Sequence, residues 1–199
     1  MMENAIAWIL IFPLFGSVAC AILGMTNRKI CYPIAVLSLA CALWAGIETL
    51  NQLIASEEHT VAYLLGGWTL DAYPRGVGIE LHADILGILI TLVVLGVGLI
   101  VSVYSKLPVQ EETPGKEPLF YTLFLLQVTG LAGICLTGDA FNLYVLIEVA
   151  ALTGYGLIAM GSNRAAAATF NYVMLGTIGA SFYLLGVGYL YIKTGTLNM

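Results

Sequence analysis

Residues 139–160 read DAFNLYVLIEVAALTGYGLIAM, and this stretch decides the fold class. It has the length of about 20 predominantly apolar residues that a helix needs to cross a bilayer. Five further stretches share this length and composition, at residues 4–24, 30–54, 82–105, 118–137 and 166–192. We therefore predict an all-α integral membrane protein with about six transmembrane helices.

The composition of the whole chain supports this prediction. Of the 199 residues, 60% are hydrophobic and 10% are charged, and the mean hydropathy is +0.94, which excludes an ordinary soluble domain. The first stretch follows Glu3 without a basic residue, unlike the positively charged start of a secretory signal peptide, so we interpret it as a span. The net charge is -5 and the sequence has no basic patch. It therefore predicts the lipid bilayer, and no nucleic acid, as a partner.

The distribution of Lys and Arg predicts the orientation of the chain. Two of the seven, Arg75 and Lys193, fall on one side of a six-span arrangement. The other five fall on the opposite side: Arg28, Lys29, Lys106, Lys116 and Arg164. Because loops rich in Lys and Arg stay inside, the N-terminus is predicted outside.

A polar segment divides the chain into two parts. Residues 106–117 hold two prolines and a glycine, and we interpret them as an inside connector within one domain. They follow an N-terminal three-helix unit, residues 1–105, and precede a second three-helix unit, residues 118–199. The first unit contains a long outside segment, residues 55–81, with several turn-forming residues. We expect this segment to be an interfacial loop with a short extended piece.

Glu148 is the strongest candidate for a functional residue. It follows Asp139 by nine residues, which places it roughly 14 Å deeper along a helix, close to the middle of an apolar core about 30 Å thick. An ionised carboxylate there costs roughly 3 kcal/mol, so such residues usually face a protein interior or a water path. Tyr144 and Tyr155 lie four and seven residues away and share its face of the helix.

The sequence offers Glu148 no cationic partner, because all seven Lys and Arg residues lie in loops or at the ends of spans. Burial favours the neutral form of a carboxyl group, whereas a nearby Lys favours the charged form. Glu148 is therefore predicted to be a proton relay whose charge depends on a partner. The alternative is a protonated packing residue that bonds to a neighbouring helix.

Four other polar residues give weaker signals. Asp84 and Asp139 stand at the starts of two spans, where an acidic side chain caps the helix and complements its dipole, and both are also kept as supporting site residues. Gln127 and Thr129 lie deep in the fourth span, where they could bond across helices.

The residues that commonly bind metals or cofactors form no recognisable site. His59 and His82 are predicted near the outer surface, and the cysteines are scattered through apolar spans: Cys20, Cys31, Cys41 and Cys135. Phosphate-binding glycine motifs and hydrolase motifs are missing from the sequence. We therefore predict no metal and no cofactor.

Two long stretches carry a resemblance to a known family. Residues 138–159, GDAFNLYVLIEVAALTGYGLIA, and residues 171–199, NYVMLGTIGASFYLLGVGYLYIKTGTLNM, resemble the antiporter-like proton-translocating subunits of respiratory complex I and of Mrp-type cation/proton antiporters. Among these, the D-type subunits of the Mrp antiporters are the most similar. Residues 66–90, GGWTLDAYPRGVGIELHADILGILI, are similar to the same family.

The resemblance implies a fold, a role and partners. Family members have about fourteen helices built around inverted repeats, so this chain corresponds to their N-terminal portion and residues 118–199 to an incomplete first transporter repeat. Glu148 corresponds to a glutamate that pairs with a lysine on a later helix and transfers protons. The implied partners are other membrane subunits, a segment that supplies this lysine, and protons with Na⁺ or K⁺. The implied location is the cell (inner) membrane.

Two functions follow as hypotheses. The first is the N-terminal part of a proton-translocating subunit, which is not catalytic by itself and could serve cation/proton antiport or a redox-driven proton pump related to NADH-quinone oxidoreductase. The alternative is a truncated structural or assembly subunit that transports nothing and packs through its glycine-rich spans.

Overall fold

The computed structural model describes residues 5–56, 60–64, 79–161 and 164–199. Six long helices in this part of the chain match the six predicted spans, and each is long and apolar enough to cross a membrane. They are α1 (Ala5–Leu23), α2 (Cys31–Ala55), α3 (Ile85–Tyr104), α5 (Glu117–Leu136), α6 (Ala140–Ala159) and α7 (Ala165–Thr194). The predicted all-α membrane fold is therefore confirmed.

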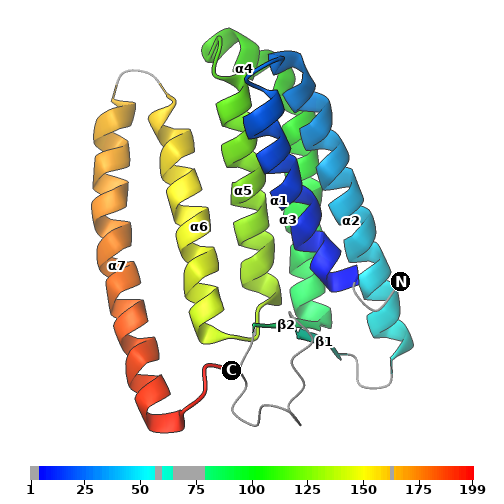
Figure 1. Ribbon diagram of the computed structural model, residues 1–199, viewed down its shortest axis with the longest axis vertical. Coiled ribbons are helices and arrows are strands. Elements are labelled where there is room, and N and C mark those ends of the chain that lie inside the picture. Colours follow the sequence, from blue (N-terminus) through cyan, green and yellow to red (C-terminus); the bar gives the residue numbers. More distant parts are fainter. Residues whose placement is uncertain (1–4, 57–59, 65–78, 162–163) are drawn as a thin grey trace.

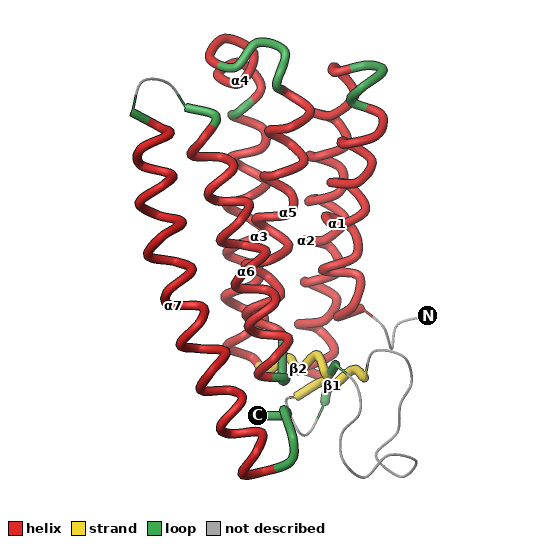
Figure 2. Tube along the Cα trace, turned by 60° about the vertical axis from the view of Figure 1, so that its left-hand side comes forward, coloured by secondary structure: helices red, strands yellow, loops and turns green. Residues whose placement is uncertain are grey.

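Four of these helices form a bundle with one apolar core. α5 packs against α1, α2 and α3, and Leu39, Leu95 and Leu125, from α2, α3 and α5, are fully buried in the same cluster. α6 packs on α5, and α7 packs on α6, so these two helices stand at one side of the bundle in both views (Figures 1 and 2). The core therefore continues across the 106–117 connector. Our division of the chain into two three-helix units remains a proposal about its repeat organisation.

The outside segment contains the expected extended piece. β1 (Thr60–Leu64) and β2 (Glu80–Asp84) pair as an antiparallel hairpin, with Thr60 opposite Asp84. The predicted third span began at residue 82, but the helix begins at Ile85, because the three residues before it pair in the hairpin and Asp84 then caps α3. His59 and Arg75 lie outside the described residues.

The connector holds a helix that the sequence analysis did not predict. α4 (Lys106–Glu112) covers most of a segment that its prolines, glycine and charges indicated as non-helical. Pro108 stands in the first turn, where a missing N–H is tolerated, and Val109 is buried. This single apolar contact was too weak a signal in a polar sequence. Gly115, with a φ of 86°, then turns the chain into α5.

The charged ends of the bundle agree with the predicted grouping. Residues 28 and 29 lie in η1 (Arg28–Ile30), at the same end as α4 and the start of α7, while Lys193 lies at the opposite end with the hairpin and the C-terminus (Figure 1). Five of the six described Lys and Arg residues are therefore at one end. The orientation of this end in the membrane stays a prediction.

Candidate functional site

The candidate site is built on α6, whose start is fixed by hydrogen bonds. The carboxylate of Asp139, which is 6% exposed, accepts a bond of 2.6 Å from the backbone N–H of Asn142. The amide of Asn142 donates in turn to Thr137 Oγ1, 2.8 Å away. Asp84 accepts a bond of 2.6 Å from the backbone N–H of Gly87. Both residues cap helices, as predicted, and both act at helix ends and not beside Glu148.

The side of α6 that packs on α5 is opposite Glu148. Gly130 of α5 lies against the backbone of Ala150, and Gly133 lies against the side chain of Leu146. Thr153 Oγ1 donates a bond of 2.8 Å to Gln127 Oε1. Positions 146, 150 and 153 share a face that is turned by roughly half a circle from position 148, at 3.6 residues per turn. Glu148 therefore points away from the four-helix core.

Tyr144 and Tyr155, predicted to share the face of Glu148, both pack on α7. The ring of Tyr144 stacks on that of Tyr183 with centroids 6.3 Å apart and an angle of 8° between their planes. Tyr155 meets the edge of Tyr172 with centroids 4.8 Å apart, and its hydroxyl lies against Gly176. The predicted stripe therefore borders the contact between α6 and α7, where two further tyrosines support it.

Glu148 lies at the edge of this contact. Its side chain is half-buried, and three apolar residues on the neighbouring side of α6 are exposed: Phe141 (47%), Val145 (40%) and Leu152 (60%). Within the described ranges no residue donates a hydrogen bond to its carboxylate or forms an ion pair with it. Tyr155 is near enough to interact with it electrostatically. Glu148 therefore sits between α7 and a surface that nothing in the described part of the chain covers.

Sequence reasoning found part of the polar pattern around the site. The predicted cross-helix bond of Gln127 is confirmed by its contact with Thr153. For Thr129 the prediction was wrong, because its hydroxyl donates to Leu125 O, one turn earlier in the same helix. The tyrosines of α7 were missed. Positions 172, 176 and 183 fall on one helical face, and this spacing was the available signal.

The remaining candidates for metal or redox chemistry do not gather at the site. No group of three His, Cys, Asp or Glu residues that could hold a metal ion occurs among the described residues. Cys20 and Cys31, far apart in sequence, meet between α1 and α2, and the thiol of each lies within hydrogen-bond reach of the other's carbonyl oxygen. Both are fully buried, which agrees with the packing role we expected for them.

Comparison with curated proteins identifies relatives of two kinds. The chain is 39% identical over 191 residues to the N-type subunit of the NADH-quinone oxidoreductase of Desulforudis audaxviator, covering 96% of this chain and 37% of the relative. It is 34% identical over 136 residues to the D-type subunit of the Na⁺/H⁺ antiporter of Bacillus subtilis, covering 68% of this chain and 26% of the relative. The chain thus spans well under half the length of these relatives. No family model matches it.

Solved structures share the fold. A chain of the membrane-bound sulfane sulfur reductase, an archaeal respiratory membrane complex, superposes with a TM-score of 0.88 at 29% identity, over 98% of this chain and 38% of that one. A chain of the Mrp complex from Dietzia matches with a TM-score of 0.79 at 23% identity, over 99% and 35%, which shows the fold alone. Both belong to multi-subunit membrane complexes. The predicted resemblance to antiporter-like subunits is therefore confirmed, and the partial coverage fits their N-terminal portion.

Proposed function

We propose that this multi-pass membrane chain, as a relative of the antiporter-like subunits, supplies the Glu148 carboxyl group as a proton relay within a larger proton-translocating assembly. The observation that carries the proposal is the place of Glu148. It lies at mid-depth on α6, turned away from the core and toward an uncovered surface. A carboxyl group in such a position is expensive to ionise without a partner.

The relay needs a partner that changes the charge of Glu148. Every Lys and Arg that the structure describes lies at an end of the bundle, too far from the middle of α6 for an ion pair. We propose that a cationic side chain, a lysine by resemblance, approaches across the uncovered side of α6 beside Val145 and Leu152. Its approach would favour the carboxylate, and its withdrawal would favour the acid. One proton would be taken up and released in each cycle.

The two tyrosines beside Glu148 fit this role. Tyr144 and Tyr155 are held by stacking on α7, so their rings border the carboxyl group at defined positions. A tyrosine hydroxyl can both donate and accept a hydrogen bond. We propose that these hydroxyls, with water, connect Glu148 to the next group in the path. Whether Na⁺ or K⁺ is exchanged against the proton depends on the rest of the assembly.

The alternative function, a structural or assembly subunit, has one observation in its favour. α7 buries only Val187 among its residues, and its small polar residues Thr177 and Ser181 face outward. An uncovered helix face of this kind suits packing against another membrane subunit. This function requires no protonation change at Glu148, so a transport measurement separates the two.

The test replaces Glu148→Gln in the assembled complex, purified from its own membranes and reconstituted into vesicles that contain a pH-sensitive dye. The matched control is Glu48→Gln, which makes the same chemical change in α2. We expect the first variant to lower the rate of proton translocation by at least about a hundredfold, as for loss of an acid–base group, and the control to keep it. Full translocation by Glu148→Gln at equal assembly would leave the structural role.

A further inference from the structure

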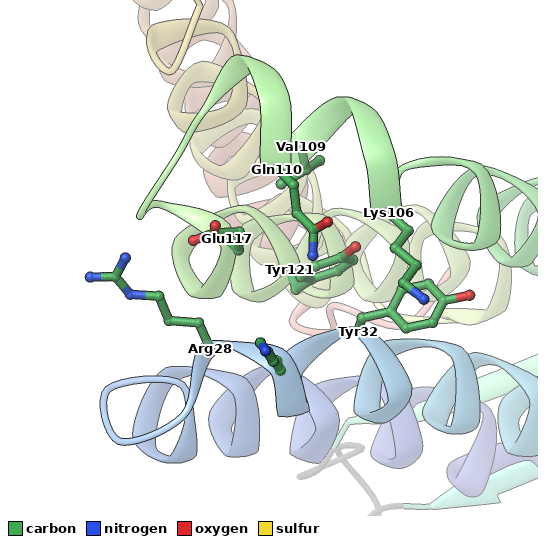
Figure 3. A pocket seen from close by; sticks show the side chains of 8 residues that line it. Arg28, Tyr32, Lys106, Val109, Gln110, Glu117 and Tyr121 are labelled. Atoms are coloured by element: carbon green, nitrogen blue, oxygen red, sulfur yellow. The ribbon is translucent and has the colours of Figure 1, made fainter.

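A cavity of about 700 Å³ opens at the end of the bundle where the α1–α2 turn, α4 and the start of α5 meet (Figure 3). It lies far from Glu148, and the proposed relay makes no use of it. Its lining combines cationic, aromatic and amide side chains, namely Arg28, Lys29, Tyr32, Lys106, Val109, Gln110, Glu117 and Tyr121. Three of the seven Lys and Arg residues of the chain therefore line one cavity.

The local folding of two connecting segments places these cations. Asn27 Oδ1 accepts a bond of 3.2 Å from the backbone N–H of Lys29 and so starts η1. The guanidinium of Arg28 lies against Gly115, where an added Cβ would be only 3.0 Å from Nη1. The first inside turn is thereby packed on the turn that precedes α5. Arg28 is presented by a defined backbone and not by a free loop.

Lys106 reaches the cavity from the opposite side. Its Nζ lies 5.0 Å from the centre of the Tyr32 ring, within the range of a cation–π contact. Figure 3 shows Lys106 with Tyr32 at one side, Arg28 at the other, and Gln110 and Tyr121 between them. Tyr121 is 3% exposed and forms part of the floor, with its hydroxyl 3.4 Å from Ser105 Oγ. The positive charges thus surround a solid aromatic base.

The protein does not neutralise this charge. Glu117 is the acidic residue in the lining, so three cations and one carboxylate leave two positive charges. Oε2 of Glu117 is shielded from solvent and accepts no hydrogen bond from a described residue. None of the three cations forms an ion pair within the described part of the chain. The acidic residues of α4, Glu111 and Glu112, are exposed outside this lining.

The depth of the cavity indicates its ligand. Its walls are the first or last turns of membrane-spanning helices, so it opens at the level of the lipid headgroups, at the end of the bundle that the positive-inside rule places inside. Basic cavities between helices at this level suit anionic headgroups. We propose that it binds the phosphate-bearing headgroup of an anionic phospholipid, with Arg28, Lys29 and Lys106 around the phosphate and the rings of Tyr32 and Tyr121 beneath the glycerol.

The test measures thermal unfolding of the full chain in a neutral detergent with short-chain phosphatidylglycerol, short-chain phosphatidylcholine or inorganic phosphate added. We expect phosphatidylglycerol near saturation to raise the melting temperature by roughly 5 °C, and the other two compounds to leave it unchanged. The joint variant Arg28→Gln, Lys29→Gln, Lys106→Gln should lose this shift. The matched control, Lys116→Gln, Arg164→Gln, Lys193→Gln, removes the same charge outside the cavity and should keep it.

Three results would overturn the proposal. An equal shift in both joint variants would mean that the lipid binds wherever charge is present. An equal shift with phosphatidylcholine would remove the role of the anionic headgroup. A shift with inorganic phosphate that needs the same three cations would assign the cavity to free phosphate. If the joint variant does not fold, native mass spectrometry of Lys106→Gln against Lys116→Gln decides, because only the first should retain less phosphatidylglycerol than the wild-type chain.

Discussion

At the scale of single residues, the environment of Glu148 depends on how two tyrosines are held. Tyr155 reaches across to α7 only because residue 176 is glycine, since an added Cβ there would overlap the tyrosine hydroxyl. Gly179, one turn later on the same helix, has no atom within 4 Å of the corresponding position. The two glycines therefore have different roles although the sequence presents them alike.

This difference can be tested by replacing Gly176→Ala. The added methyl group should displace Tyr155 and lower the free energy of unfolding by about 1–3 kcal/mol, as overpacking does. The joint variant Gly176→Ala, Tyr155→Phe should recover part of the loss, because it removes the overlapping hydroxyl. Unfolding by sodium dodecyl sulfate in mixed micelles measures the change. Gly179→Ala is the control and should alter stability by less than about 1 kcal/mol; equal losses at both positions would contradict the packing described.

At the scale of elements, the helices were predictable and their mutual arrangement was not. Apolar length alone placed six spans within a few residues of those observed, and Asp84 and Asp139 marked two helix starts. The stripe of Tyr144, Glu148 and Tyr155 followed from helical periodicity. Which neighbour this stripe meets depends on tertiary packing, so the stacking on α7 could not be read from the sequence. α4 was missed because one buried valine supports it.

The contact between α5 and α6 depends on the closest approach of their backbones. A Cβ at position 130 would lie 3.0 Å from the backbone nitrogen of Ala150 and 3.2 Å from its Cα, and backbone atoms cannot move aside as a side chain can. We expect Gly130→Ala to separate the helices and to lower the free energy of unfolding in mixed micelles by about 1–3 kcal/mol. Gly96→Ala on α3, where no atom lies within 4 Å, should be neutral or stabilising. The reverse order would refute this packing.

At the scale of the whole molecule, the bundle has one covered and one uncovered side. The core residues come from α1, α2, α3, α5 and β2, whereas α7 contributes almost nothing to it. Large apolar side chains on α7 are exposed, and Phe170, Leu175 and Phe182 are each more than 60% accessible. This side can face lipid or another part of an assembly. Its position beside Glu148 favours a partner that also completes the relay.

The predicted orientation can be measured on intact cells. We expect a membrane-impermeant maleimide to label Lys193→Cys from outside, and to label Lys116→Cys only after the membrane is opened. The chain without a new cysteine is the control, and its native Cys20 and Cys31 should stay unlabelled because they are fully buried. Labelling of Lys116→Cys in intact cells would reverse the assigned topology and place the basic cavity outside.

The central claim is that Glu148 gains and loses a proton while the assembly works. Infrared difference spectroscopy of the reconstituted complex, comparing its resting and driven states, observes the carbonyl stretch of a protonated carboxyl group directly. We predict a band that changes between the two states in the wild type and in Glu48→Gln, and that disappears in Glu148→Gln. A carboxyl signal that is identical in the wild type and in Glu148→Gln would contradict the account, because Glu148 would then keep one protonation state throughout.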